Sequence, residues 1–317
     1  MNLDYSVLII DEVHPILLEK LRAFKVDYSP NISLDQLRQV ISNYDILIMR
    51  SKLHFSKDWI KLASKLKVVG RLGSGMDNID VEFAESQGIA CYNAPEGNRN
   101  AVAEQTIGIM LSLLANVYRS AKQVERNIWD RKGNIGIELE QLTLGIIGYG
   151  NVGSQLAKRL RGFGCEVLAY DKYKKDYGNE FVKETDLEEI FEKADVVSFH
   201  VPLNESSKYM FNSHFISSMR KSFYLLNLSR GEVVKTSDLI NGFKDGKILG
   251  CGLDVLENEK LETLTTEQEN NFTYITENEN IILTPHIGGL TQNSFIRLAE
   301  VLSDKILQWA KGRPLVN

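Results

Sequence analysis

The sequence predicts an α/β protein with parallel β-sheets covered by helices. Short, apolar, β-branched segments alternate along the chain with amphipathic segments of helical length. Strands that are apolar on both faces are typical of parallel sheets buried between helices. The strand candidates form two series, one before and one after a long segment that begins at residue 98. We therefore expect two domains of this class.

The expected elements follow in chain order. The first series of strand candidates comprises residues 5–10, 45–49 and 66–73, and the second comprises residues 142–150, 166–171, 195–202, 223–229, 247–255 and 280–286. Between the two series, apolar positions predict a largely buried helix that connects the domains: Val102, Ile107, Ile109, Met110, Leu113, Leu114 and Val117. The strongly polar stretch 259–280 is expected to be mostly a solvated surface excursion.

Composition excludes several classes of protein. The chain has 317 residues, of which 43% are hydrophobic and 25% charged, as is ordinary for a globular protein of about two domains. Its net charge is −5 and its lysines and arginines are dispersed, so neither a nucleic acid nor an anionic membrane is an expected partner. No stretch reaches ~18 uninterrupted apolar residues, and no transmembrane helix is expected.

The cysteines and the N-terminal residues indicate a cellular location. Cys91, Cys165 and Cys251 are far apart and form no C-x-x-C pair, which argues against a disulfide framework and against a zinc site. No metal is expected. The first residues lack the basic segment, long apolar run and cleavage site of a signal peptide. We therefore expect a cytoplasmic protein.

A glycine-rich motif follows the strand candidate at 142–147. Gly148, Gly150 and Gly153 form G-x-G-x-x-G directly before a helical segment. The first glycine permits a tight turn, the second lets the backbone approach a pyrophosphate, and the third allows close helix–strand packing, while the helix N-terminus attracts the anion. This context predicts a dinucleotide site, and a glycine-rich turn without a nucleotide is the alternative.

Asp171 supports the dinucleotide interpretation. It ends the next strand candidate, 18 residues after Gly153 (171 − 153), where a carboxylate is placed to accept hydrogen bonds from an adenosine ribose. Because the carboxylate would repel a 2′-phosphate, Asp171 favours NAD over NADP. The neighbouring Lys172, Lys174 and Lys175 could soften that preference, or they form a solvated cluster.

Three further strand ends carry residues suited to acid–base chemistry. Arg230 follows the strand candidate at 223–229, and arginine can hold a carboxylate or polarise a carbonyl group. Asp254 ends another strand, with Glu257 and Glu259 just beyond it, and His286 follows the last strand. Open α/β sheets bind ligands at the carboxyl ends of their strands. Taken singly, each residue has an ordinary alternative: a surface Arg-Gly turn, a solvated acidic loop or a structural histidine.

Taken together, these features resemble the D-isomer-specific 2-hydroxyacid dehydrogenase family. The resemblance covers nearly the whole chain and rests on "GRLGSGMDNID" (70–80), "NAPEGNRNAVAE" (93–104), "GIIGYGNVG" (145–153), "HVPL" (200–203), "NLSRG" (227–231), "GLDVLENE" (252–259) and "TPHIGG" (284–289). It implies two Rossmann-like or flavodoxin-like domains, with the NAD-binding domain (98–285) inserted in the substrate, or catalytic, domain (1–97 and 286–317). It also implies a homodimer built through 101–117 and the extension 118–132.

The resemblance implies a role for each strand-end residue. Arg230 matches the substrate-orienting arginine, Glu259 the acid that partners the histidine, and His286 the proton donor or acceptor. A carboxylate bonded to one imidazole nitrogen fixes the tautomer, raises the pKa of the histidine, and leaves the other nitrogen for the substrate oxygen. Lys260 stands where the family usually has proline, so Glu257 remains an alternative partner.

The family pattern also implies binding residues. The cofactor set comprises Ser74, Gly148, Gly150, Asn151, Val152, Gly153, Asp171, Val201, Pro202, Leu228, Ser229, Arg230, Asp254, His286 and Gly289. The substrate set comprises Arg50, Lys52, Leu72, Gly73, Ser74, Gly75 and Arg230. In that set, Lys52 is either a phosphate contact or simply an exposed lysine.

The segment "NAPEGN" (93–98) resembles the phosphoglycerate dehydrogenase branch more than the lactate or formate branches. This implies oxidation of 3-phosphoglycerate to 3-phosphohydroxypyruvate for serine synthesis. Reduction of glyoxylate, hydroxypyruvate or another 2-oxo acid is the nearest alternative, and an NAD(H)-sensing protein like the co-repressors of this fold is an alternative of another class. An appended C-terminal regulatory domain, present in some phosphoglycerate dehydrogenases, is expected to be missing. The set Arg230, Glu259 and His286 favours an enzyme.

Overall fold

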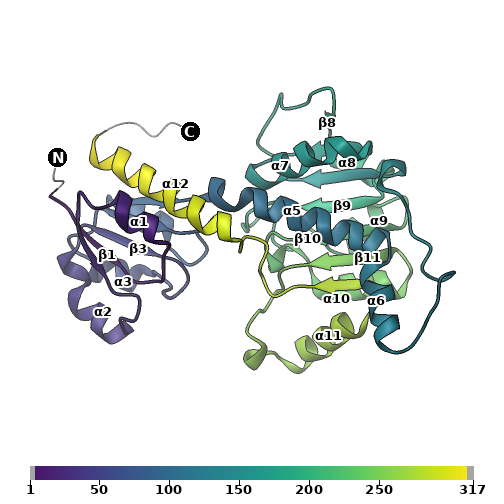
Figure 1. Cartoon of the computed structure of the whole chain (residues 1–317), viewed down its shortest axis with the longest axis horizontal. Coiled ribbons are helices and arrows are strands. Elements are labelled where there is room, and N and C mark those ends of the chain that lie inside the picture. The colour runs from purple at the N-terminus through teal and green to yellow at the C-terminus, as the bar shows by residue number, and fades with distance from the viewer. Residues whose placement is uncertain (1–3, 313–317) are drawn as a thin grey trace. The chain divides into compact units, whose positions relative to one another are not determined.

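The computed structural model describes residues 4–312 and divides the chain into two compact units. Unit 1 is Met1–Arg99 with Leu290–Asn317, and unit 2 is Asn100–Gly289. Unit 2 is thus inserted in the sequence of unit 1, and the yellow C-terminal helix returns to the purple N-terminal unit (Figure 1). The expected domains 1–97 with 286–317 and 98–285 include residues 1–3 and 313–317, which lie outside the described residues.

Unit 1 contains a five-stranded parallel sheet in the order β2-β1-β3-β4-β5. Its strands are β1 (Ser6–Ile9), β2 (Lys25–Tyr28), β3 (Ile46–Met49), β4 (Val68–Arg71) and β5 (Ala90–Asn93). The helices of this unit are α1 (Pro15–Lys20), α2 (Leu34–Val40), η1 (Ile41–Asn43), α3 (Lys57–Leu62), α4 (Val81–Ser86) and α12 (Gln292–Ala310). The strand order is that of flavodoxin-like folds.

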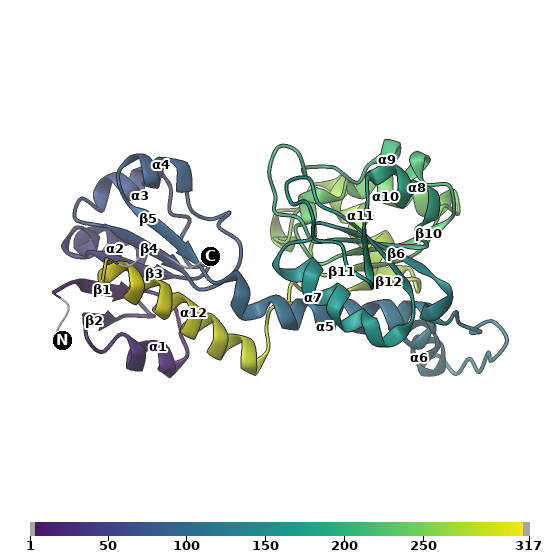
Figure 2. The ribbon, with the colours of Figure 1, turned by 90° about the horizontal axis from the view of Figure 1, so that it is seen from above.

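Two helical layers cover the sheet of unit 1. Alternate residues of β1 point to opposite layers: Val7 packs with α1 and α12, and Leu8 packs with α2, α3 and α4. The views in Figures 1 and 2 agree that α12 lies beside α1. Because successive side chains of a strand face opposite sides, a strand buried on both faces must be apolar throughout, as "SVLI" and "ILIM" nearly are.

Unit 2 contains a seven-stranded parallel sheet in the order β12-β11-β10-β9-β6-β7-β8. Its strands are β6 (Thr143–Ile147), β7 (Glu166–Tyr170), β8 (Val182–Glu184), β9 (Val196–Phe199), β10 (Phe223–Asn227), β11 (Ile248–Leu253) and β12 (Ile281–Leu283). Numbered within the unit, this order is 7-6-5-4-1-2-3, which is the doubly wound Rossmann order with one added strand. The two parallel sheets confirm the predicted fold class.

The helices of unit 2 lie on both faces of its sheet. One layer is formed by α5 and α7, and the other by α8, α9, α10 and α11. The bounds are α5 (Pro95–Leu114), α6 (Val117–Glu125), η2 (Leu139–Gln141), α7 (Asn151–Leu160), η3 (Arg161–Phe163), α8 (Leu187–Lys193), α9 (Ser213–Ser218), η4 (Gly231–Val233), α10 (Thr236–Lys244), η5 (Leu261–Thr263) and α11 (Thr266–Glu277).

The connecting helix differs from its prediction at both ends. Helix α5 begins at Pro95, as suits proline in the first turn, and ends at Leu114. Asn116 then adopts a left-handed conformation (φ 53°), and α6 starts at Val117, which is exposed rather than buried. Among the described helices, none alone is long and apolar enough to cross a membrane; only α5 and α6 taken together, across a 63° bend, meet that length and composition.

The stretch 259–280 is mostly exposed, as expected, but much of it is helical, which the sequence did not show. Residues Thr266–Glu277 form helix α11, which begins with a capping box between Thr265 and Gln268. A capping box satisfies two of the amide groups left unpaired at a helix start. Ile275 is buried in the core of unit 2, so the helix is anchored although most of its residues are polar.

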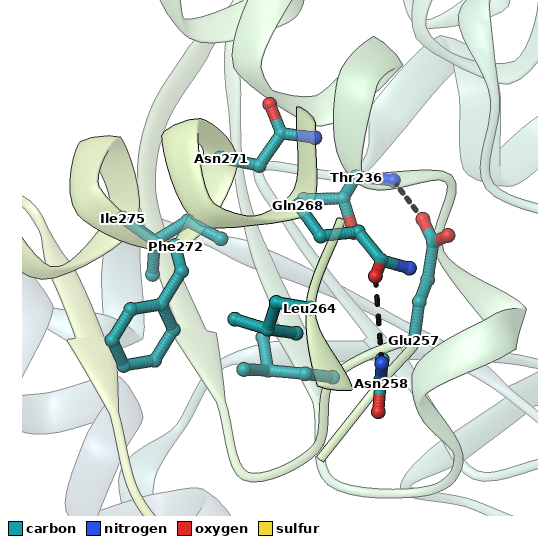
Figure 3. Close-up of a pocket in the computed structure, with 9 residues that line it drawn as sticks. Thr236, Glu257, Asn258, Leu264, Gln268, Asn271, Phe272 and Ile275 are labelled. Atoms are coloured by element: carbon teal, nitrogen blue, oxygen red, sulfur yellow. Dashed lines mark hydrogen bonds between the residues drawn. The ribbon is translucent and has the colours of Figure 1, made fainter. Parts of the chain in front are cut away.

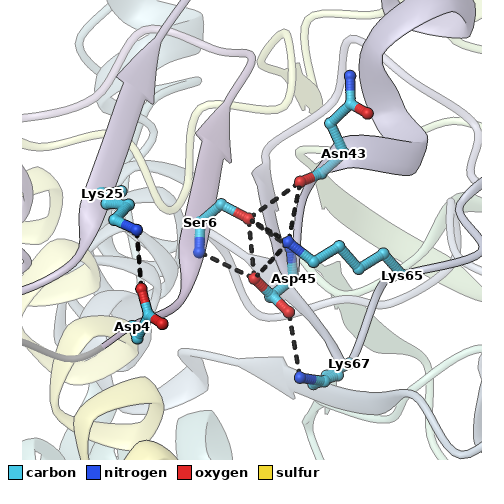
Figure 4. Close-up of polar contacts among 7 residues, drawn as sticks. All are labelled: Asp4, Ser6, Lys25, Asn43, Asp45, Lys65 and Lys67. Carbon is cyan, nitrogen blue, oxygen red and sulfur yellow. Dashed lines mark hydrogen bonds and ion pairs between the residues drawn. The ribbon is translucent and has the colours of Figure 1, made fainter.

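Asp45 fastens the amino-terminal edge of the unit 1 sheet. It lies just before β3, and its carboxylate accepts hydrogen bonds from Ser6 N at 2.9 Å and Ser6 Oγ at 2.8 Å. Lys65 Nζ and Lys67 Nζ lie 3.3 Å and 3.1 Å from its oxygens (Figure 4). The side chain therefore links β1 to β3 and to the residues that precede β4.

Candidate functional site

His286 and Glu259 form a hydrogen-bonded pair beyond the carboxyl ends of β12 and β11. His286 Nδ1 lies 2.9 Å from Glu259 Oε2. This bond raises the pKa of His286; burial opposes the rise, the charges of Glu259 and Asp254 support it, and the charge of Arg230 opposes it. Within residues 4–312, Nε2 of His286 has no hydrogen-bond partner. The pair can therefore hold a proton and present it through Nε2.

The structure pairs His286 with Glu259 rather than with Glu257. The Oε1 atom of Glu257 accepts a hydrogen bond from Thr236 N at 2.5 Å, at the start of α10. Its Oε2 atom lies 3.4 Å from the hydroxyl of Tyr209. Glu257 is thus occupied in anchoring its own loop.

Asp254 organises the backbone around His286. This carboxylate is 2% exposed. It accepts hydrogen bonds from Thr284 Oγ1 (2.5 Å), Gly288 N (2.7 Å), Ile287 N (2.9 Å) and Gln105 Nε2 (3.2 Å). The amide of His286 also donates to the carbonyl oxygen of Asp254 at 2.9 Å. His286 has φ 53°, a left-handed conformation that costs a non-glycine residue about 1 kcal/mol, and these bonds hold it there.

Arg230 follows β10 in an extended conformation. Asn227 Nδ2 donates to the carbonyl oxygen of Arg230 at 2.9 Å, and Ser229 Oγ donates to Asn227 Oδ1 at 2.8 Å. A side chain at Gly231 would place its Cβ 1.8 Å from the carbonyl oxygen of Leu256. Glycine here therefore lets the segment that leads to Glu259 lie directly against the segment that carries Arg230.

The glycine motif has the geometry that a dinucleotide requires. Gly148 has φ 97°, and a Cβ there would lie 2.4 Å from the carbonyl oxygen of His200. A Cβ at Gly153 would lie 2.1 Å from the carbonyl oxygen of Gly148, so helix α7 packs tightly on the turn. Among residues 4–312, no atom lies within 4 Å of the corresponding position at Gly150, which leaves open space there in front of the N-terminus of α7. These features fit a bound pyrophosphate.

A pocket of about 300 Å³ adjoins this motif. Five residues of the expected cofactor set line it: Gly148, Gly150, Asp171, Val201 and Pro202. Sequence reasoning missed the others in its wall, which include Tyr173, Leu187, Asn204, Ser206 and Met210. Its size and its acidic edge suit an adenosine group.

Asp171 is bound by the backbone around it. Its Oδ2 accepts from Tyr149 N at 2.8 Å, and its Oδ1 accepts from Tyr173 N and Lys174 N, both at 2.9 Å. Burial would raise the pKa of Asp171, but these amide bonds and the charge of Lys174 outweigh it and lower the pKa. The carboxylate is therefore ionised at neutral pH. Lys172, Lys174 and Lys175 are exposed beside it.

The remaining cofactor candidates in unit 2 lie at other strand and helix ends. Asn151, Val152 and Gly153 form the first turn of α7; Leu228, Ser229 and Arg230 follow β10; Asp254 follows β11; and His286 and Gly289 follow β12. A further pocket of about 300 Å³ adjoins the Glu259–His286 pair, and Leu256, Leu261, Phe272 and Leu283 contribute apolar groups to its wall. Its presence was not anticipated from the sequence.

In unit 1, the expected carboxylate-binding loop follows β4. Leu72 N donates to Met49 O and Gly73 N to Arg71 O, both at 2.9 Å. No hydrogen bond within the described part of the chain uses the amides of Ser74 and Gly75. These two amides are therefore the ones placed to hold an anion. The side chain of Ser74 is hydrogen-bonded to Asn98.

The two expected cations of unit 1 have different surroundings. The guanidinium of Arg50 stacks on the ring of Phe295, with its central carbon 4.8 Å from the ring centre. Lys52 Nζ instead donates to the carbonyl oxygens of Pro30 and Ile32. Arg50 thus keeps the edges of its guanidinium for a ligand, whereas the ammonium of Lys52 is already occupied.

Three residues that support the site were missed from the sequence. Asn227 stands inside the quoted "NLSRG", and a polar residue ending an apolar strand was the available signal. Thr284 stands inside "TPHIGG" and bonds to Asp254. Gln105 gave no signal, because it lies on α5, far away in sequence from Asp254.

Comparison with known proteins places the chain in a family. Residues 107–288 match the NAD-binding domain of the D-isomer-specific 2-hydroxyacid dehydrogenases. A D-3-phosphoglycerate dehydrogenase of Methanocaldococcus jannaschii is 33% identical over 98% of this chain and 59% of its own length. A hydroxypyruvate reductase of Thermotoga maritima is 34% identical over 88% of this chain and 89% of its own length.

A solved structure agrees with these relatives. The D-lactate dehydrogenase of Aquifex aeolicus, in complex with NAD and lactic acid, has a TM-score of 0.84 and 27% identity, covering 97% of this chain and 96% of that one. The chain spans little more than half the length of the phosphoglycerate dehydrogenases it matches. From the matched NAD-binding domain and the relatives at 33% and 34% identity, the chain belongs to the D-isomer-specific 2-hydroxyacid dehydrogenase family, and its cofactor is NAD.

Proposed function

We propose that this protein is an NAD-dependent dehydrogenase that interconverts a D-2-hydroxy acid and its 2-oxo acid. The observation that carries the proposal is the Glu259–His286 pair, 2.9 Å apart, with Nε2 of His286 left for a substrate oxygen. Arg230 follows strand β10, which pairs with β11, and its charge acts on His286. General acid–base assistance from such a histidine is worth roughly 10²–10⁴ in rate.

The proposed proton transfer runs through His286. When the hydroxy acid is oxidised, Nε2 of His286 accepts the hydroxyl proton, and Glu259 stabilises the imidazolium that forms. Bound NAD supplies the hydride acceptor. In the reverse direction the imidazolium returns the proton to the carbonyl oxygen. Arg230 would orient the substrate through its carboxylate.

For the substrate, we propose 3-phosphoglycerate, oxidised to 3-phosphohydroxypyruvate. The "NAPEGN" segment and the relatives of about 30% identity named D-3-phosphoglycerate dehydrogenase support it. Arg50 is the better candidate for a phosphate contact, because the ammonium of Lys52 is bonded to Pro30 and Ile32. The similarity to a hydroxypyruvate reductase over 89% of that enzyme supports a second candidate, reduction of hydroxypyruvate or glyoxylate.

We further propose a cytoplasmic homodimer. Six apolar residues in and after α6 are exposed, which is an unusual concentration for a surface that stays in contact with water: Val117, Val124, Ile128, Trp129, Ile135 and Ile137. A second copy of the chain would cover them. Cys91, Cys165 and Cys251 are all free thiols, as suits a reducing compartment.

The experiment is a panel of 2-oxo acids with NADH and NADPH. We expect phosphohydroxypyruvate with NADH to give the highest kcat/KM, and His286→Ala to lower kcat at least ~100-fold. His214→Ala is the control, because His214 is an exposed histidine of the same unit. Wild-type turnover by His286→Ala would refute the catalytic assignment. Tight NADH binding without turnover of any 2-oxo acid would instead favour an NAD(H)-sensing protein.

A further inference from the structure

The loop that carries Glu259 is closed by the side chain of Asn258. Asn258 Oδ1 accepts a hydrogen bond from Lys260 N at 3.0 Å. On the other side of the amide, Nδ2 lies 3.2 Å from Thr263 Oγ1 and 3.4 Å from Gln268 Oε1. Figure 3 shows the bond to Gln268. One amide group thus bridges the residue after Glu259 to the end of the loop and to helix α11.

Gln268 connects this closure to a fixed element of unit 2. The side-chain Oε1 of Gln268 also accepts a hydrogen bond from Thr265 N at 3.0 Å. The backbone N–H of Gln268 donates to Thr265 Oγ1 at 3.3 Å, and these two bonds form the capping box of α11. Farther along α11, Ile275 is buried against the sheet. The loop is therefore tied to a helix that the core holds in place.

The preceding part of the loop is anchored separately. The carbonyl of Leu256 packs against Gly231, where a Cβ would come within 1.8 Å. Glu257 accepts a hydrogen bond from Thr236 N at 2.5 Å, as Figure 3 also shows. The backbone is thus fixed before Glu259 by these contacts and after it by Asn258.

Glu259 itself has little else to hold it. Its side chain is 44% exposed, and His286 is its only hydrogen-bond partner among residues 4–312. The position of its carboxylate is therefore set by the backbone on either side. An exposed ion pair that must order a long side chain gains too little free energy by itself to hold a loop closed.

We propose that Asn258 is a positioning residue for the reaction: it holds loop 258–263 closed against α11, so that Glu259 stays within hydrogen-bond distance of His286. The inference rests on the proposed function, because it gives the pair a part in proton transfer. Asn258 does not touch the reacting atoms. Its effect reaches the substrate only through Glu259 and His286.

The first test is Asn258→Ala, which removes the bonds to Lys260, Thr263 and Gln268. We expect kcat for 2-oxo acid reduction to fall about tenfold, a part of the ~10²–10⁴ that acid–base assistance provides. The Kd for NADH should stay within twofold of wild type. The pKa of His286, followed by ¹⁵N NMR titration of its imidazole, should fall toward its ordinary value because Glu259 is less often in contact.

The other charged groups that face His286 do not depend on this loop. Asp254 raises the pKa of His286 and Arg230 lowers it, and both lie on other segments. The matched control is Asn271→Ala. Asn271 lines the same small cavity of about 40 Å³ as Asn258 but has no hydrogen bond to the loop (Figure 3). This variant should keep the wild-type kcat and His286 titration.

A rescue experiment separates positioning from general packing. In Asn258→Ala the amide of Lys260 has lost its acceptor, so Lys260→Pro then deletes no hydrogen bond. The φ of Lys260 is −92°, somewhat more negative than the ~−65° that proline imposes, so proline needs a small backbone shift and then restricts the open loop. In the Asn258→Ala background, we expect Lys260→Pro to recover at least half of the loss in kcat, measured on a logarithmic scale. In the wild-type background it should lower kcat, because it removes the donor to Asn258.

Asn258→Asp covers the case in which the alanine variant does not fold. Aspartate keeps an acceptor oxygen for Lys260 N, but its second oxygen then faces Gln268 Oε1, which is also an acceptor. The kcat of Asn258→Asp should therefore lie between those of wild type and Asn258→Ala. Wild-type kcat together with a wild-type His286 titration in Asn258→Ala, or in Asn258→Asp if only that variant folds, would overturn the proposal. Failure of the proposed function gives a different result, namely wild-type turnover by His286→Ala, while the NMR titration needs no turnover at all.

Discussion

Replacing Asp45 by asparagine removes one negative charge just before strand β3 of unit 1 and changes the side-chain volume very little. The carboxylate is 3% exposed and accepts two hydrogen bonds from Ser6. Asparagine keeps one acceptor oxygen, but its amide group faces Lys65 or Lys67, with which it cannot form an ion pair. The variant therefore tests what the charge contributes to the stability of unit 1.

The expected magnitude follows from the pKa of Asp45. Burial raises this pKa, but hydrogen bonds from Ser6 and the contacts with Lys67 and Lys65 outweigh it and lower the pKa from 3.8 to about 2. Because the folded pKa is lowered, the stabilisation is present above the unfolded pKa of ~3.9 and is lost as pH falls toward the folded value. A difference of about 2 between the two pKa values corresponds to about 2.5 kcal/mol at neutral pH.

Tryptophan fluorescence reports on this unit. Trp59 is buried and Trp309 partly buried in unit 1, whereas Trp129 is 80% exposed in unit 2. Urea unfolding at pH 7 should show Asp45→Asn to be less stable than wild type by about 2–3 kcal/mol, with the difference shrinking by pH 3. Asp4→Asn is the control, because Asp4 and Lys25 form a fully exposed pair (Figure 4). A loss for Asp45→Asn that is the same at pH 7 and pH 3 would refute this reasoning.

Three predictions concern unit 2. Glu259→Gln should lower the pKa of His286, so that reduction of the 2-oxo acid, which needs the protonated imidazole, declines from a lower pH than in wild type; an unchanged pH profile of kcat/KM would contradict it. Asp171→Ala should lower kcat/KM with NADH at least ~10-fold. It should also reduce the preference for NADH over NADPH, because the carboxylate that repels the 2′-phosphate of NADPH is gone. Steady-state kinetics with both cofactors checks this. Asp254→Asn places an amide group against the backbone donors around His286 and should lower kcat at least ~10-fold; wild-type kcat would show that the loop holds its shape without this charge.

The central strands of both sheets were visible in the sequence, whereas most edge strands were not. The strands that sequence analysis missed are β2, β5 and β8, each at the edge of its sheet. An edge strand is covered on fewer sides, so it needs no continuous apolar run: β2 reads KVDY and β8 reads VKE. The edge strand β12 was found because its residues IIL are apolar and lead into the motif with His286.

For the site, too, sequence motifs identified residues, whereas side-chain contacts became visible only in the folded structure. Strand ends in the sequence pointed to Arg230 and His286, whereas Glu259 was chosen from the family resemblance, with Glu257 left as an alternative. The sequence could not show that the ammonium of Lys52 is bonded to Pro30 and Ile32, because those contacts depend on how a surface loop folds. Helix α11 was missed because only a few apolar residues, Ile275 among them, anchor it.

The histidine motif shows most clearly why residue identity alone was not enough. His286 has a left-handed backbone conformation, which is uncommon for any residue other than glycine. Asp254 holds this conformation, because its buried carboxylate accepts hydrogen bonds from Ile287 N at 2.9 Å and from Gly288 N at 2.7 Å. A Cβ at Gly288 would lie 2.9 Å from that carboxylate, so glycine is needed for the approach. The glycine after His286 thus serves the aspartate that fixes the histidine, in addition to any room it leaves for the nicotinamide.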